Sequence, residues 1–135
     1  MEFHRGRLFD HVHLRVRDLD ASRRFYEAAL GPLGIELHPG EGHFWADELF
    51  VSADGVPTAD LHLAFAAENE DVVGRFHAAA IAAGGKDNGA PGERAYHLGY
   101  YAAYVLDPDG NNVEAVYHGP QRRSATSVVV EPLQG

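Results

Sequence analysis

The sequence contains no cysteine, which excludes disulfide bonds, thiolate metal ligands and cysteine nucleophiles and fits a reducing compartment. It also has few basic residues: 11 Lys and Arg against 20 Asp and Glu give a net charge of −9. A surface this negative repels phosphate groups, so neither nucleic acid nor an anionic membrane is an expected partner. No apolar run approaches the roughly 20 residues of a membrane span, and Met1–Arg5 lacks the apolar stretch of a signal peptide. We therefore expect a cytoplasmic protein.

The remaining composition is typical of one globular domain over residues 1–135, with 45% hydrophobic and 23% charged residues. The unusual feature is the number of histidines, nine in all. Without cysteine, histidine is the principal neutral metal ligand, and it also transfers protons readily near neutral pH. The histidines are therefore the first candidates for chemistry.

The chain contains an internal repeat with a spacing of 51 residues. Identical residues align in order: His11 with His62, Arg24 with Arg75, Phe25 with Phe76, Ala28 with Ala79, Ala29 with Ala80 and Gly34 with Gly85. Accidental matches are the alternative in an alanine-rich chain. The ordered set favours duplication of one unit, with module one at about residues 8–55, module two at about 59–118 and a tail at 119–135.

Two predicted strands place histidines on an uncovered face. Residues 10–16 alternate polar and apolar, so His11 and His13 share one face and aliphatic residues share the other. Residues 61–65 alternate in the same way and put His62 on the matching face. Both histidines of the repeat therefore point to the side that a helix does not cover.

Each strand is followed by a predicted helix and a small meander of strands. Asp18 or Asp20 can cap the first helix and Asn69 the second. Gly31–Pro32 and Gly84–Gly85 end these helices. The meander strands are predicted at 35–38, 44–45 and 49–52 in module one and at 100–106 and 113–117 in module two, with a weaker strand near Lys86. The helix covers one face of each sheet, and the other face can form a concave site.

Glu114 is the third candidate, because it lies inside the predicted apolar strand 113–117. A carboxylate there is costly unless it is hydrogen-bonded or bound to a cation. If the two modules pair about a pseudo-twofold axis, His11 and His62 approach each other. Two histidines and one carboxylate then match the facial triad that holds a divalent ion. The alternative is that each histidine is a structural or surface residue, as most single histidines in strands are.

Two parts of the chain resemble the vicinal oxygen chelate superfamily, which includes glyoxalase I, the bleomycin- and fosfomycin-resistance proteins and the extradiol dioxygenases. The first is Phe9–Asp18 with Ser22–Tyr26, and the second is Val105–Glu114, which contains the turn Asp107–Gly110. The resemblance covers residues 8–118. It implies an α+β fold of two paired βαβββ modules that form a cup-shaped mixed sheet with the helices outside.

The resemblance also implies a metal site of His11, His62 and Glu114. Glyoxalase I has a fourth ligand, a glutamate in the last strand of module one. The matching stretch Leu49–Ser52 has no carboxylate, and Glu48 is off-register. The pattern is therefore closer to the three-ligand sites of the fosfomycin-resistance enzymes and extradiol dioxygenases. Because the missing glutamate also transfers a proton in glyoxalase I, glyoxalase I activity itself is not expected.

At such a site one divalent ion (Fe, Mn, Ni, Co or Zn) would chelate two neighbouring oxygens of a small substrate as a Lewis acid. The candidate catalytic residues are Glu114, Tyr101 and Tyr104, and the candidate substrate contacts are Arg15, His13, Trp45, Phe50, His97 and Tyr100. Arg15 matches a glyoxalase I position that contacts an anionic group, which implies a contact with a substrate carboxylate; the alternative is an arginine at a strand end that is simply solvated. His13 is alternatively a further ligand. Tyr101 faces opposite to Tyr100 and Tyr104, so one set reaches the cup, and aromatic packing is the alternative for each.

Two functions fit these residues. The first is a metal-dependent enzyme with lyase, isomerase, transferase or dioxygenase chemistry. The alternative is a metal-free binding protein of the bleomycin-resistance type. A third interpretation is a protein that serves only as an oligomeric scaffold. A homodimer is expected from the resemblance and from Ser127–Glu131, which can add an edge strand or dock on a partner chain. Whether the modules pair within or between chains stays open, and the substrate depends on loops 38–60 and 86–99.

Overall fold

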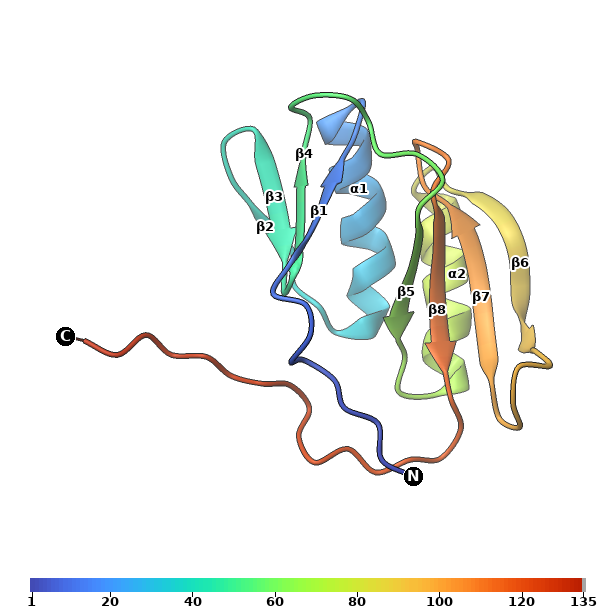
Figure 1. Cartoon of the computed structure of the whole chain (residues 1–135). Coiled ribbons are helices and arrows are strands. Elements are labelled where there is room, and N and C mark those ends of the chain that lie inside the picture. Colours follow the sequence, from blue (N-terminus) through green and yellow to red (C-terminus); the bar gives the residue numbers. More distant parts are fainter. Residues whose placement is uncertain (135) are drawn as a thin grey trace.

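The computed structural model describes residues 1–134 and shows two modules of the same design (Figure 1). Module one contains β1 (Val12–Arg15), α1 (Leu19–Leu30), the short 3-10 helix η1 (Gly31–Leu33), β2 (His38–Pro39), β3 (His43–Ala46) and β4 (Leu49–Ser52). Module two contains β5 (His62–Ala66), α2 (Glu70–Ala82), β6 (Lys86–Glu93), β7 (Tyr101–Leu106) and β8 (Asn112–Tyr117). The predicted α+β class and the βαβββ order are therefore confirmed in both modules.

Each module forms its own four-stranded mixed sheet. The strand order is β1-β4-β3-β2 in the first sheet and β5-β8-β7-β6 in the second, so the second repeats the first. In both sheets the first strand of the module pairs in parallel with the last, and the other pairs are antiparallel. This equivalence confirms the duplication that the 51-residue spacing predicts.

Local sequence signals set the ends of the two helices. Asp18 caps α1 by accepting a hydrogen bond from the Ala21 amide at 3.1 Å. Asn69 caps α2 in the same way, from the Val72 amide at 2.8 Å. After η1 the chain turns at Gly34, whose φ of 75° is a left-handed conformation that glycine adopts without strain. No helix among the described residues has the length and hydropathy needed to cross a membrane.

The core lies between the sheets and their helices. Leu14 of β1 and Val51 of β4 are fully buried, as are Phe25 of α1 and Phe76 of α2. Figure 1 shows α1 behind the sheet of module one and α2 behind that of module two, and the two helices contact each other. The helices therefore join the modules on one side, and the opposite faces of both sheets are left uncovered for a site.

Three segments differ from what the sequence pattern suggests. The first is the predicted strand 35–38, of which only His38 lies in a strand, the two-residue β2. The weak strand near Lys86 is a strand of eight residues, β6, which pairs with β7 through two shifts in register. Its glycines and Pro91 lower strand propensity, so a propensity pattern understates it. Residues 127–131 form no strand within the part of the chain described, and Val128–Val130 are exposed. The tail runs extended away from the sheets (Figure 1), so it adds no edge strand within one chain.

Tyr26 links α1 to the turn between β7 and β8. Its buried hydroxyl donates to Oδ2 of Asp107 at 2.6 Å. Oδ1 of Asp107 accepts the amides of Asp109 and Asn111, each at 2.9 Å. Burial, and then the charge of Asp107, raise the pKa of Tyr26 well above its ordinary value. The phenol of Tyr26 therefore keeps its proton and donates it to Asp107.

Replacing this phenol in Tyr26→Phe should lower the free energy of unfolding by about 1.5–3 kcal/mol, the usual worth of a hydrogen bond to a charged group. Urea unfolding measures the change. Tyr117→Phe is the matched control, because it removes a hydroxyl from a half-buried tyrosine that packs against the same core. It should change stability by less than about 0.5 kcal/mol. Equal losses in the two variants would show that the contact with Asp107 contributes nothing.

Candidate active site

Strand pairing in module two brings His62 and Glu114 together. In β8, Val113 and Ala115 face the core, so alternation turns Glu114 to the uncovered face. β5 runs parallel to β8 with Ala64 beside Glu114, which places His62 two residues earlier on the same face. Nε2 of His62 lies 2.7 Å from Oε1 of Glu114. Two of the three predicted ligands are therefore adjacent.

The two side chains differ sharply in exposure: Glu114 is 1% exposed and His62 is 54% exposed. Each carboxylate oxygen accepts one hydrogen bond, Oε1 from His62 and Oε2 from the hydroxyl of Tyr100 at 2.5 Å. A carboxylate withdrawn from water needs such partners. The arrangement presents a fixed, buried oxygen next to an imidazole that solvent or a ligand can reach.

Two of the predicted tyrosines face Glu114. Tyr104 pairs with Glu114 across β7 and β8, and its ring centre lies 6.2 Å from that of His62. Burial is the main cause that raises the pKa of both Tyr100 and Tyr104, and the Glu114 carboxylate adds to it. Both phenols therefore keep their protons at neutral pH and act as hydrogen-bond donors.

Tyr101, a predicted catalytic residue, lies on the opposite face. It pairs with Tyr117 in the register of β7 and β8, and both rings pack against the hydrophobic core. Because alternate residues of a strand face opposite sides, Tyr101 does not reach the face that carries Glu114. Its assignment is corrected, and Tyr104 is the candidate that β7 supplies.

His97 and His118 lie together beside Tyr100. Nε2 of His97 lies 2.9 Å from Nδ1 of His118, the two rings stack, and the Tyr100 ring makes edge contacts with both. Burial, and then the neighbouring His97 and Arg5, lower the pKa of His118, which favours its neutral form. His97 thus contacts the ring of Tyr100, whose hydroxyl bonds Glu114. His118 is not among the predicted site residues, although the period of two from Glu114 to His118 is a signal for it.

His11 is not brought to this pair within one chain. Its side chain is 63% exposed, and its Nδ1 lies 2.7 Å from Oδ1 of Asp10. Across residues 1–134, no three His, Cys, Asp or Glu side chains gather closely enough to hold a metal ion. β1 belongs to the sheet of module one, whereas β5 and β8 belong to the other sheet (Figure 1). A three-ligand site is therefore not formed inside a single chain.

The uncovered face of module one contains a hollow of about 370 Å³. The residues that line it are His11, His13, Trp45, Asp47, Glu48, Leu49 and Phe50. Four predicted site residues therefore meet here rather than around Glu114. Trp45 is 43% exposed, and its ring stacks on His38 with 4.2 Å between the centres. The lining of the hollow thus includes both aromatic and acidic residues.

Strand register identifies Phe50 as the module-one counterpart of Glu114. The 51-residue repeat equates His13 with Ala64. His13 pairs with Phe50 in the same way as Ala64 pairs with Glu114. An aromatic ring therefore occupies the position at which a fourth carboxylate ligand would lie, and Glu48 falls before the start of β4.

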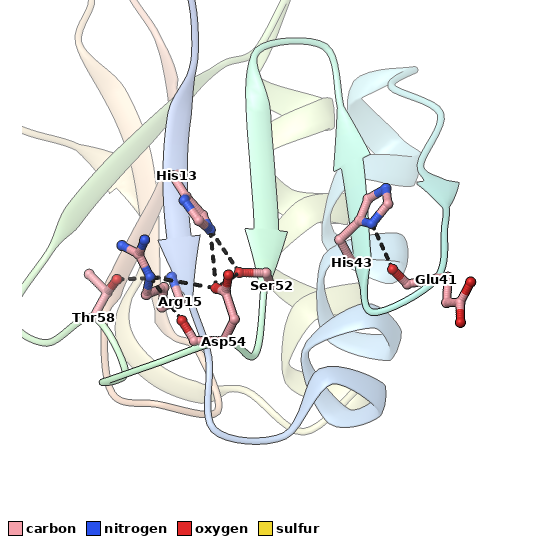
Figure 2. Close-up of polar contacts among 7 residues, drawn as sticks. All are labelled: His13, Arg15, Glu41, His43, Ser52, Asp54 and Thr58. Atoms are coloured by element: carbon pink, nitrogen blue, oxygen red, sulfur yellow. Dashed lines mark hydrogen bonds and ion pairs between the residues drawn. The ribbon is translucent and has the colours of Figure 1, made fainter.

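A chain of hydrogen bonds holds His13 at the end of β4 (Figure 2). Nε2 of His13 lies 2.7 Å from Oγ of Ser52, and the Ser52 hydroxyl donates to the Asp54 carboxylate. The Ser52 hydrogen bond is the main cause that lowers the pKa of Asp54. Sequence reasoning missed Ser52 and Asp54, although the alternation of β4 puts Ser52 on the face of Phe50.

Arg15 is engaged by the same loop. Its Nε donates to the Asp54 carbonyl at 3.1 Å and lies 3.6 Å from Oδ1 of Asp54. Its backbone amide donates to the Thr58 hydroxyl at 3.0 Å (Figure 2). The predicted contact with a substrate carboxylate therefore competes with a carboxylate of the chain itself.

Comparison with known proteins places these features in context. Residues 8–115 match the Glyoxalase/Bleomycin resistance protein/Dioxygenase superfamily. The uncharacterized protein PA2024 of Pseudomonas aeruginosa is 34% identical over 125 residues, covering 82% of this chain and 88% of that protein. The crystal structure of a glyoxalase/bleomycin resistance protein from Albidiferax ferrireducens is 35% identical with a TM-score of 0.72, covering 81% of this chain and 98% of that one. A glyoxalase I mutant from Zea mays is 23% identical with a TM-score of 0.57, covering 82% of this chain but 44% of the maize chain.

Proposed function

Because the chain belongs to the glyoxalase/bleomycin resistance protein/dioxygenase superfamily, we propose that it is a divalent-metal-dependent enzyme acting on a small oxygen-rich molecule. His62 and Glu114 of one chain and His11 of a second chain would hold the ion. The observation that carries the proposal is the buried Glu114 carboxylate, 2.7 Å from the open imidazole of His62.

The residues present fit such an ion. One carboxylate and two imidazoles form the mixed oxygen and nitrogen set that suits Fe, Mn, Ni, Co or Zn. Tyr100 fixes the second oxygen of Glu114, as outer hydrogen bonds commonly do for ligating carboxylates. When bound, the ion would supply Lewis-acid chemistry toward two neighbouring oxygens of the substrate.

The tyrosines would supply the proton-bearing groups of the site. Tyr100 uses its hydroxyl to orient Glu114. Tyr104 keeps its phenol proton and can donate a hydrogen bond to a substrate oxygen on which negative charge develops. The guanidinium of Arg94 lies 5.3 Å from the centre of the Tyr104 ring and steadies it.

A second copy of the chain is part of the proposal, because one chain keeps His11 apart from His62 and Glu114. His11 and His62 are 63% and 54% exposed, so a partner chain can reach both. The match with this chain covers 44% of the maize glyoxalase I chain. Two copies of this chain would therefore supply about as many modules as that longer chain can contain. In a twofold dimer, each of two equivalent sites would combine module one of one chain with module two of the other.

Elemental analysis of protein purified without chelator tests the metal. We expect roughly one equivalent of a transition metal per chain, and its loss in His62→Ala with an unchanged circular dichroism spectrum. His77→Ala is the control, because His77 lies on α2 and pairs with Asp87. It should retain the metal. Wild-type protein that stays empty after incubation with each of the five candidate ions would refute the proposal.

The alternative function is metal-free binding of a small molecule. The hollow of module one favours it, since Phe50 packs with His13 and His43 at 5.0 Å between ring centres and offers an aromatic surface. A protein that takes up no metal and binds a ring compound equally well with and without EDTA would select this function over catalysis.

A further inference from the structure

The hydrogen bonds around His13 fix which ring nitrogen carries the proton. The Asp54 carboxylate can only accept, so the Ser52 hydroxyl directs its single proton to Asp54. The 2.7 Å contact between Oγ of Ser52 and Nε2 of His13 therefore requires Nε2–H to be the donor. In the neutral ring, Nδ1 then carries a lone pair and no proton.

Nδ1 is thus the polar atom that His13 retains for a ligand. Nδ1 has no hydrogen-bond partner among residues 1–134, and the side chain is 27% exposed. His13 lines the hollow together with Trp45 and Phe50, and its ring meets that of Phe50 edge-on at 5.0 Å. A flat ligand can lie against these rings while Nδ1 accepts one hydrogen bond from it.

The charge of the hollow also restricts which ligands can bind there. Asp47 and Glu48 line it, and no Lys or Arg is among its lining residues. Arg15, on the same strand as His13, is held by Asp54. The chain as a whole carries a net charge of −9. Without an ion bound, an anionic ligand would therefore be repelled and would find no guanidinium partner in the hollow.

We propose that this hollow selects ring compounds that donate a hydrogen bond to Nδ1 of His13 and carry no negative charge, such as neutral phenols. Methyl ethers lack the donor, and carboxylates add the wrong charge. His13 is then the specificity-determining residue, and Ser52 and Asp54 are positioning residues that act through it. The inference deepens the proposed function and rests on it, since it names the substrate class of a site to which His11 also belongs.

The single tryptophan makes the inference measurable. Trp45 is the only tryptophan of the chain and lines the hollow, so quenching of its fluorescence reports binding there. The probes are p-cresol, 4-methylanisole and p-toluate, titrated with EDTA present at pH 8. We expect p-cresol to bind roughly tenfold more tightly than either of the others, the effect of one paired against one unpaired polar group. Equal affinities for the three probes, or no binding of p-cresol, would overturn the inference.

Three variants assign the selectivity to His13. In His13→Gln, the amide keeps a group near the position of Nε2 but removes Nδ1, so the preference for p-cresol should fall to about twofold or less. In Ser52→Ala, the proton of the neutral His13 ring can lie on either nitrogen. The affinity for 4-methylanisole should therefore rise relative to that for p-cresol. His77→Gln, on the far side of module two, should keep the full preference. Full preference in His13→Gln would overturn the assignment.

Failure of this inference is distinguishable from failure of the proposed function, because the titrations contain EDTA and need no ion at His62 and Glu114. A protein that takes up no metal but still prefers p-cresol would refute the metal proposal and support the selectivity of the hollow. A protein that holds its metal and binds the three probes equally would do the reverse.

Discussion

Mixing His11→Ala with Glu114→Gln should restore metal binding that neither variant has alone. Each variant removes one ligand from every site of its own homodimer. In the mixed dimer, the intact His11 of one chain meets the intact His62 and Glu114 of the other. If the chains assort at random, half of the dimers are mixed, and each mixed dimer has one intact site out of two. About one quarter of the wild-type metal content should therefore return.

The size of this effect follows from the placement of the three ligands. Within one chain, β1 keeps His11 away from the pair formed by β5 and β8. Loss of an outer hydrogen-bond partner typically costs roughly 10–100-fold in metal affinity, and loss of a direct ligand should cost more. Each variant alone should therefore be nearly metal-free, against which a return to one quarter is easily seen.

The experiment co-expresses the two variants and measures metal per chain. His62→Ala mixed with Glu114→Gln is the matched control, because both changes lie in module two. No mixed dimer of that pair has an intact site, so no metal should return. If the first mixture recovers nothing, or if both mixtures recover equally, the ligands do not combine across two chains.

The architecture follows from patterns that are local in the sequence. The alternation in residues 10–16 and 61–65 depends only on neighbouring side chains, and it correctly gives β1 and β5. Asp18 and Asn69 cap the helices by bonds to amides three residues ahead. Such signals need no knowledge of the rest of the chain, and the repeat then extends them from one module to the other.

The site was predictable only where register follows from these local patterns. That Glu114 lies on the uncovered face follows from its place between two core-facing residues of β8. The exclusion of Tyr101 required the antiparallel register of β7 and β8. The separation of His11 from Glu114 depends on how the two sheets sit relative to each other, and the bond from Ser52 to His13 depends on the pairing of β1 with β4. No periodicity within one strand encodes either of these.

Gly85 is packed so closely that no side chain fits there, which the sequence alone does not reveal. The repeat aligns it with Gly34, whose φ of 75° calls for glycine while the space around it is open. At Gly85 the reason is instead close approach. An added Cβ would meet the side chain of Val105, the ring of Phe25 at 2.7 Å and the backbone oxygen of Ala80 at 2.8 Å. That oxygen accepts the Gly85 amide at 2.9 Å, so moving it away would cost the hydrogen bond that ends α2.

Gly85→Ala should therefore lower the free energy of unfolding by about 3 kcal/mol, the upper end of the usual range for overpacking a core. Gly74→Ala is the matched control, because Gly74 lies within α2 and nothing lies within 4 Å of an added Cβ. It should raise stability by about 0.5–1 kcal/mol, since alanine favours the helix. Urea unfolding of both variants beside the wild type measures the difference. Stabilisation by both changes would mean that the chain after α2 shifts away from Phe25 and Val105 at little cost, and that the contact between the modules at this point is not close-packed.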